Sequence, residues 1–163
     1  MNHKYYYNFP IGCICIEDDG NYITAIDLVD KQGGSTEESK LAREAYRQLR
    51  EYFEQKRTKF NLPICFYGTE FQKKVWNELR NIPFGSRVSY KEIATKIGNP
   101  NASRAVGGAI NKNPILIVVP CHRVIGANGK LIGFACGIEV KKYLLDLEEE
   151  LERNKTFIER IDQ

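Results

Sequence analysis

Apolar residues alternate with polar ones near the start of the chain and later recur at helical spacing. Residues 5–30 are rich in Ile, Tyr and Cys, and Asp-Asp-Gly-Asn interrupts them in a way typical of a hairpin turn. From Ser35, with Glu38 completing a capping box, helical spacing of apolar residues predicts a helix to about Lys56. The apolar run 62–66 predicts a further strand.

A turn-like Tyr-Gly-Thr sequence suggests a boundary, so we expect two domains, residues 1–66 and residues 67–163. The second domain opens with another capping box, Thr69 with Gln72, before an amphipathic helix that ends near Pro83. The expected fold class is α+β, with the strands concentrated in the first domain.

Two short helices are expected next, over about 89–97, closed by Gly98, and 102–111. An Asn-Pro-Asn turn separates them, which suggests a helix-turn-helix. The apolar run 115–119 predicts a buried strand or extended segment, and a last amphipathic helix is expected over 138–152.

Charge is unevenly distributed along the chain. Residues 68–145 hold 12 Lys and Arg against 4 Asp and Glu, a pattern consistent with binding to a polyanion or with an ordinary solvated basic surface. No apolar stretch reaches the roughly 18 residues of a membrane span, and the start lacks a signal-peptide pattern. With an odd number of cysteines, 5, we expect a cytoplasmic protein whose thiols are reduced.

Cys121 follows the run 115–119 within the sequence Pro-Cys-His-Arg-Val. A cysteine in this setting is commonly an inert core residue. Here, however, His122 can accept a proton and Arg123 can favour the thiolate, as a nucleophilic thiol requires. Neighbouring side chains of a strand point to opposite faces, so His122 needs a bend or a relaying water to act on Cys121. Pro120 favours such a bend.

A catalytic histidine usually needs a carboxylate to orient it. The last helix offers four candidates, and sequence spacing does not choose among Glu139, Asp146, Glu148 and Glu149. The residues alone therefore predict a Cys/His/acid site within a basic helix-turn-helix domain.

Five motifs follow one another along the C-terminal half: FQKKVW (71–76), PFGSRVSYKEIA (83–94), NPNASRAVGGAINKNP (99–114), PCHRVIGANGKLIGF (120–134) and KKYLLDLE (141–148). In type and separation they resemble the methylated-DNA–protein-cysteine methyltransferases, also called O6-alkylguanine-DNA alkyltransferases. Over residues 1–65 the resemblance is architectural. It implies a small ribonuclease-H-like α/β N-terminal domain and a helical winged-helix/helix-turn-helix C-terminal domain.

The resemblance implies a DNA repair protein that flips an O6-alkylguanine out of double-stranded DNA and transfers the alkyl group irreversibly to Cys121. O4-alkylthymine is a further candidate substrate. The activity would be that of a methylated-DNA–protein-cysteine S-methyltransferase, with one turnover, no cofactor and no metal, acting as a monomer from the minor groove. His122 would draw the thiol proton through a water, and Glu148 would orient His122.

Other roles follow from the same resemblance. Arg104 would enter the base stack, Tyr90 would hydrogen-bond the guanine ring and help to rotate the nucleotide, and Asn113 would brace the active-site turn. The remaining DNA and substrate contacts are expected from Ser89, Ala102, Ser103, Gly107, Val124, Gly133, Phe134 and Ala135. Small residues around Arg104 suit close approach to a groove, although packing of glycine and alanine against another helix explains them equally well.

Some positions depart from the family pattern. Phe134 and Cys136 stand where relatives usually have Tyr and Gly. In the segment expected to wall the base pocket, a hydroxyl is therefore lost and a side chain is added. Some relatives hold zinc in the N-terminal domain, but no standard zinc-ligand spacing links the candidates His3, Cys13, Cys15 and Cys65.

Two other functions fit parts of the sequence. A helix-turn-helix protein can sense alkylated bases without transfer, like the alkyltransferase-like proteins, but those relatives have Trp where this chain has Cys121. A cysteine hydrolase using Cys121 and His122 would turn over repeatedly, yet no separate oxyanion loop is evident and the other histidine is His3.

Overall fold

The N-terminal part is a three-stranded antiparallel sheet covered by one helix. The computed structural model describes residues 2–30, 32–34 and 37–161, without the side chains of 156–161. The sheet has the order β1-β2-β3, and its strands are β1 (His3–Phe9), β2 (Gly12–Asp18) and β3 (Ile23–Val29). The hairpin turn expected between β2 and β3 is confirmed, since the Asp19 carboxylate accepts hydrogen bonds from the backbone of Asn21 and Tyr22.

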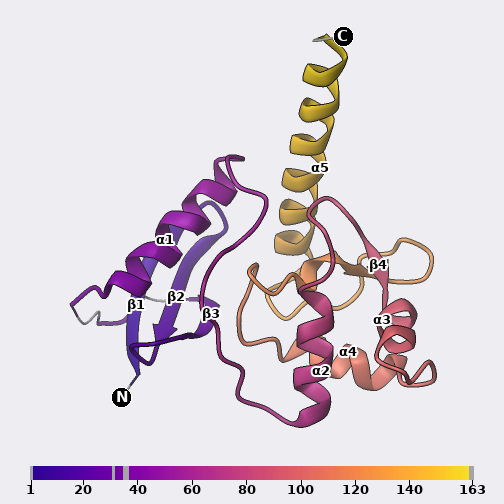
Figure 1. Cartoon of the computed structure of the whole chain (residues 1–163), viewed down its shortest axis with the longest axis horizontal. Helices are drawn as coiled ribbons and strands as arrows, with labels where there is room; N and C mark the ends of the chain where they lie inside the picture. The colour runs from indigo at the N-terminus through magenta and orange to yellow at the C-terminus, as the bar shows by residue number, and fades with distance from the viewer. Residues whose placement is uncertain (1, 31, 35–36, 162–163) are drawn as a thin grey trace.

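Helix α1 (Lys40–Phe53) lies across this sheet, as Figure 1 shows. Its N-cap is Ser39, whose side chain accepts from the Ala42 amide, so the predicted start at Ser35 is wrong; Ser35 itself lies outside the described residues. The reason is a tertiary contact, because the Ser39 hydroxyl also donates to the buried Asp18 carboxylate of β2. The helix ends three residues before the predicted Lys56.

The two apolar runs expected as strands are extended segments that join the edge of β3. The run 62–66 makes one isolated parallel bridge, Ile64 to Ile23, so the predicted strand is wrong. Pro63 lacks an amide hydrogen and limits the pairing. The second run is bridged in the same way, Ile115 to Ile26, which confirms the extended alternative. One buried core consequently runs through both halves of the chain.

The C-terminal part gathers three helices, α2 (Glu70–Leu79), α3 (Tyr90–Lys96) and α4 (Ser103–Asn111) (Figure 1). The capping box at the start of α2 is confirmed, and Gly98 takes the positive φ expected of a residue that closes α3. Two short strands, β4 (Val88–Ser89) and β5 (Val124–Ile125), pair in parallel beside them. This pairing attaches α3 to the segment that carries Cys121.

Helix α5 (Ile138–Ile161) is longer than predicted, and its C-terminal half projects from the body of the molecule (Figure 1). The apolar side chains of Leu144 and Leu147 are buried as expected. Two charged side chains of α5 are also buried, Lys141 and Glu148, and no hydropathy pattern predicts that. In the described part of the chain, no helix is long and apolar enough to cross a membrane.

Candidate active site

Cys121 lies in a tight bend and not in a strand. Residues Cys121–Arg123 form one turn of 3-10 helix, so the alternation of side chains along a strand does not apply to His122. Pro120 has φ −82° and ψ 65°, and the Cys121 amide donates to the Val119 carbonyl at 2.8 Å. These values describe an inverse γ-turn, which confirms that the chain bends at Pro120.

A second, strained turn precedes the first. Ile117 has φ 71°, which is rare for a β-branched residue, and the Val118 amide donates to the Leu116 carbonyl at 2.8 Å. Asn113 spans the loop, because its side-chain amide donates to the Val119 carbonyl at 2.8 Å while its oxygen accepts from the Ile115 amide at 3.0 Å. The fold therefore imposes the geometry of the cysteine turn.

A buried carboxylate meets the histidine behind this turn. Oε2 of Glu148 lies 2.6 Å from Nε2 of His122, and the two side chains are 1% and 0% exposed. Arg123 donates from Nε and Nη2 to the two oxygens of the same carboxylate, at 2.8 and 3.1 Å. The hydroxyl of Tyr52 and the amide of Gly85 complete the set, at 2.6 and 3.1 Å. The Glu148 carboxylate thus accepts hydrogen bonds from four residues.

These contacts determine which of the two side chains, Glu148 or His122, carries the proton. Burial acts to raise the pKa of Glu148, but the hydrogen bonds from His122 and Arg123 and the charge of Arg123 outweigh it and hold the pKa below its usual value. Burial lowers the pKa of His122 despite the opposing effect of Glu148. With the carboxylate ionised, Nε2 of His122 is the donor, which leaves Nδ1 as a proton acceptor. Nδ1 is buried and has no hydrogen-bond partner among the described residues.

The thiol itself is 5% exposed, and burial raises the pKa of Cys121 to about 11. The expectation that Arg123 favours the thiolate directly is wrong, because the guanidinium pairs with Glu148. Its central carbon lies 5.6 Å from the centroid of the Phe84 ring. Two side chains act against burial and lower the pKa of Cys121: Asn113, through a hydrogen bond, and then Lys141, through its charge. The resting protein therefore holds a neutral thiol that must lose its proton during reaction.

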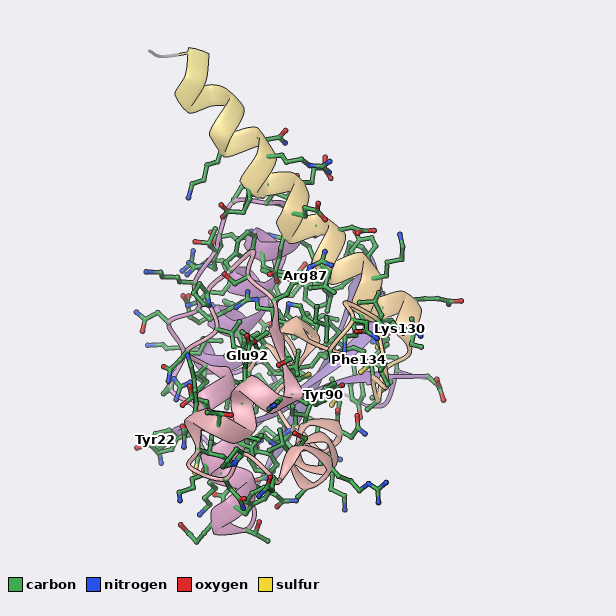
Figure 2. All side chains as sticks on the ribbon, turned by 90° about the vertical axis from the view of Figure 1, so that its right-hand side faces the viewer. Tyr22, Arg87, Tyr90, Glu92, Lys130 and Phe134 are labelled. Atoms are coloured by element: carbon green, nitrogen blue, oxygen red, sulfur yellow. The ribbon has the colours of Figure 1, made fainter. Side chains whose placement is uncertain are left out.

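The loop between β5 and α5 contacts both α3 and α5, and its Cys136 lies close enough to Cys121 to act on the pKa of that thiol. Tyr90, the first residue of α3, donates from its hydroxyl to the Ile132 carbonyl at 3.0 Å. In Figure 2, Tyr90 and Phe134 lie on the same face of the molecule. The ammonium group of Lys141 lies 5.9 Å from the Phe134 ring centroid and donates to the Val124 carbonyl at 2.5 Å. Two other predicted contacts, Gly133 and Ala135, are exposed in this loop.

Helix α4 forms a separate, open surface. Arg104 is exposed on its first turn, away from the buried carboxylate, next to the half-buried Ala102 and Ser103. A Cβ added at Gly107 would meet only the Tyr90 ring, at 3.8 Å, and one added at Gly108 would meet nothing within 4 Å. Close packing between helices consequently does not explain these glycines.

Of the four acids left open by the sequence, three are exposed and only Glu148 contacts His122. Sequence reasoning missed Tyr52, Gly85 and Lys141, and no local pattern could have found them because each contact is long-range. Ser89 caps α3 through a capping box with Glu92. Within the described ranges, no three His, Cys, Asp or Glu side chains group as metal ligands.

Fold and site together define a class of protein in which a buried cysteine, followed by a hydrogen-bonded histidine and carboxylate pair, is attached to a helix-turn-helix unit. Known sequences identify the family. The 6-O-methylguanine DNA methyltransferase DNA binding domain matches residues 70–150, and the ribonuclease-like domain of the same proteins matches residues 2–66. The chain belongs to the 6-O-methylguanine DNA methyltransferase family.

Individual relatives are similar to this chain in sequence or structure over most of their length. The methylated-DNA–protein-cysteine methyltransferase of Methanosarcina barkeri is 55% identical over 146 residues, which cover 86% of this chain and 92% of the relative. The crystal structure of Mycobacterium tuberculosis O6-methylguanine methyltransferase superposes with a TM-score of 0.85 at 41% identity, covering 92% and 94% of the two chains. A structure of the M. tuberculosis protein in complex with DNA superposes with a TM-score of 0.84 at 41% identity, covering 91% and 94%.

Proposed function

We propose that this protein repairs O6-alkylguanine in double-stranded DNA by transferring the alkyl group to Cys121. It is a methylated-DNA–protein-cysteine methyltransferase by family, and DNA is its partner. The observation that carries the choice of acceptor is the hydrogen-bonded pair His122 and Glu148 directly behind the Cys121 turn. No other cysteine in the described part of the chain has a histidine beside it.

Proton transfer comes first. One water relays the proton from the Cys121 sulfur to Nδ1 of His122, while the Glu148 carboxylate stabilises the imidazolium that forms. The imidazole can accept this proton because burial keeps its pKa low and the histidine neutral. Lys141 offsets part of the cost of the thiolate.

Alkyl transfer follows as an in-line displacement. The sulfur lone pair forms a bond to the alkyl carbon, the bond from that carbon to O6 breaks, and the electron pair stays on the guanine. Tyr90 turns its hydroxyl from the Ile132 carbonyl to the guanine and compensates the charge that develops on the ring by donating a hydrogen bond. Burial, with a contribution from Cys121, raises the pKa of Tyr90 and keeps this hydroxyl protonated. The thioether product has no carbonyl for water to attack, so each protein molecule reacts once.

Access to the base requires extrusion from the duplex. Arg104 enters the vacated stack from the minor groove while the small side chains of Ala102, Ser103 and Gly107 allow α4 to approach the backbone. The exposed position of Arg104 and the open space at Gly108 support this assignment. Val124, Gly133, Phe134 and Ala135 wall the base pocket, and Ser89 holds the start of α3 beside it.

Every group in this scheme comes from a single chain, which supports action as a monomer. The scheme also needs a reduced Cys121, and the described cysteines are all free thiols, which supports a cytoplasmic location. A hydrolase would form a thioester that water can attack and would turn over repeatedly, whereas the proposed transfer stops after one reaction at a thioether. A sensor would need no buried His122 and Glu148 pair.

The test is incubation with a duplex that contains O6-methylguanine, followed by intact-protein and peptide mass measurement. We expect one added methyl group per protein, located on Cys121, and none in Cys121→Ala. Cys136→Ser is the matched control and should still be methylated. Binding without any mass change would favour the sensor and contradict the proposal.

A further inference from the structure

The N-terminal unit reaches the catalytic carboxylate through one side chain. Tyr52 lies in the last turn of α1, is completely buried, and donates from its hydroxyl to Oε2 of Glu148 at 2.6 Å. The two residues are 96 positions apart. The same oxygen is the one that contacts Nε2 of His122, also at 2.6 Å. Tyr52 and His122 consequently share one acceptor atom.

The ring of Tyr52 is held in place by aromatic neighbours. Phe53 and Phe84 meet it edge-on, with centroids 5.5 and 6.1 Å away, and Phe60 is tilted against it at 5.6 Å. With the ring held by three aromatic neighbours in a packed core, the hydroxyl has little freedom to point elsewhere. Burial, followed by the charge of Glu148, raises the pKa of Tyr52 well above its usual value, so the hydroxyl remains a donor.

We propose that Tyr52 is a positioning residue of the alkyl-transfer site, supplied by the N-terminal unit, which fixes Oε2 of Glu148 and limits how strongly that oxygen attracts the proton of His122. This inference rests on the proposed function, because it assigns Tyr52 a role in the same proton relay. A hydrogen bond to a carboxylate oxygen draws off part of its negative charge and weakens it as an acceptor for a second donor.

The other groups around the carboxylate define what remains when the hydroxyl is removed. Arg123 contributes a guanidinium from the cysteine turn, and Gly85 contributes an amide from the α2–β4 loop. On α5, Lys141 acts on His122 and lowers its pKa, and Tyr143 acts on Tyr52. In Tyr52→Phe the Arg123 and Gly85 hydrogen bonds remain, so Glu148 stays ionised and its charge acts more strongly on His122. The imidazolium is thereby stabilised, and the histidine should titrate at higher pH.

The chain offers a direct measurement because it contains only 2 histidines, His3 and His122. NMR titration of the imidazole signals in Tyr52→Phe should place the His122 midpoint about one pH unit above that of the wild type. His3 is the internal reference and should not move. Tyr46→Phe is the matched control, since Tyr46 lies on the same helix but stacks on Tyr7 at 4.4 Å.

A kinetic readout tests the same effect. The rate measured is that of single-turnover methyl transfer at saturating duplex, which falls as the pH is lowered. In Tyr52→Phe, the pH at which this rate reaches half of its plateau should lie higher by the same amount. The half-saturating duplex concentration should stay unchanged. A purely structural role would lower the melting temperature and leave both midpoints at their wild-type values, which would overturn the inference. Wild-type protein that leaves Cys121 unmethylated would instead refute the proposed function, whatever Tyr52 does to the titration of His122.

Discussion

The cysteine turn and the α4 surface lie in the same unit, yet they are built in opposite ways. Around Cys121 the groups are buried, charged and joined by hydrogen bonds from α1, α5 and the intervening loops. Around Arg104 the residues are small or exposed, and space is left open above Gly108. In the free protein the first region is held by internal hydrogen bonds, whereas the second leaves exposed the surface that the proposed DNA contact requires.

This difference predicts how each region responds to substitution. A buried charge network fails as a unit, because removal of one member leaves another charge buried without compensation. An exposed side chain can be removed with little effect on the fold. Changes at the turn should therefore affect every substrate and the stability of the protein, and changes on α4 should affect only duplex DNA.

The largest effect is expected from Glu148→Gln. The amide keeps the shape but removes the charge that compensates Arg123 and supports His122, so the transfer rate should fall by about 10²- to 10⁴-fold. The free energy of unfolding should fall by about 3–5 kcal/mol. Rapid-quench kinetics and denaturant titration measure the two effects.

The neighbouring Glu149→Gln provides the matched control. Glu149 is exposed and pairs with Arg87 at 3.2 Å on the surface, so its loss should cost less than about 1 kcal/mol and leave the rate unchanged. Equal losses in the two variants would mean that the buried contacts of Glu148 have no special role.

Arg104→Ala should have an intermediate effect that depends on the substrate. Without the side chain that fills the stack, repair of a duplex should slow by roughly 10- to 100-fold, because base extrusion costs a few kcal/mol. Reaction with free O6-alkylguanine should proceed at the wild-type rate. Lys112→Ala, which removes an exposed cation just after α4, is the control for general electrostatic attraction. Equal slowing on both substrates would rule out the stacking role.

The smallest effect is expected from mild acid. Because burial lowers the pKa of His122 below the usual value of about 6.5, more than half of the histidine is neutral at that pH. The single-turnover rate should therefore keep more than half of its plateau at about pH 6.5 and fall only below it. The free energy of unfolding should also fall as the pH drops below about 6.5, since His122 binds a proton more tightly in the unfolded chain than in the folded protein. A rate midpoint above about pH 7 would contradict the assignment of His122 as proton acceptor.

Local patterns predicted most of the helices, and the exceptions have identifiable causes. The capping box at Thr69 marks the start of α2 because both of its hydrogen bonds lie within four residues. The same pattern at Ser35 failed because Ser39 is tied to Asp18 of the sheet, a contact that local sequence does not contain. The run 62–66 has strand composition, but it pairs through a single bridge at the edge of β3.

By itself the sequence determined the chemical groups of this protein: a cysteine followed by histidine and arginine, a bend at Pro120, and the ordered motifs of a DNA alkyltransferase. Only the tertiary structure selected Glu148 from four acids, turned Arg123 from the thiol toward that carboxylate, and brought in Tyr52 from the other end of the chain. The physical reason is that hydrogen bonds within a turn depend on neighbouring residues. The protonation of a buried group depends instead on every charge and donor that the whole fold packs around it.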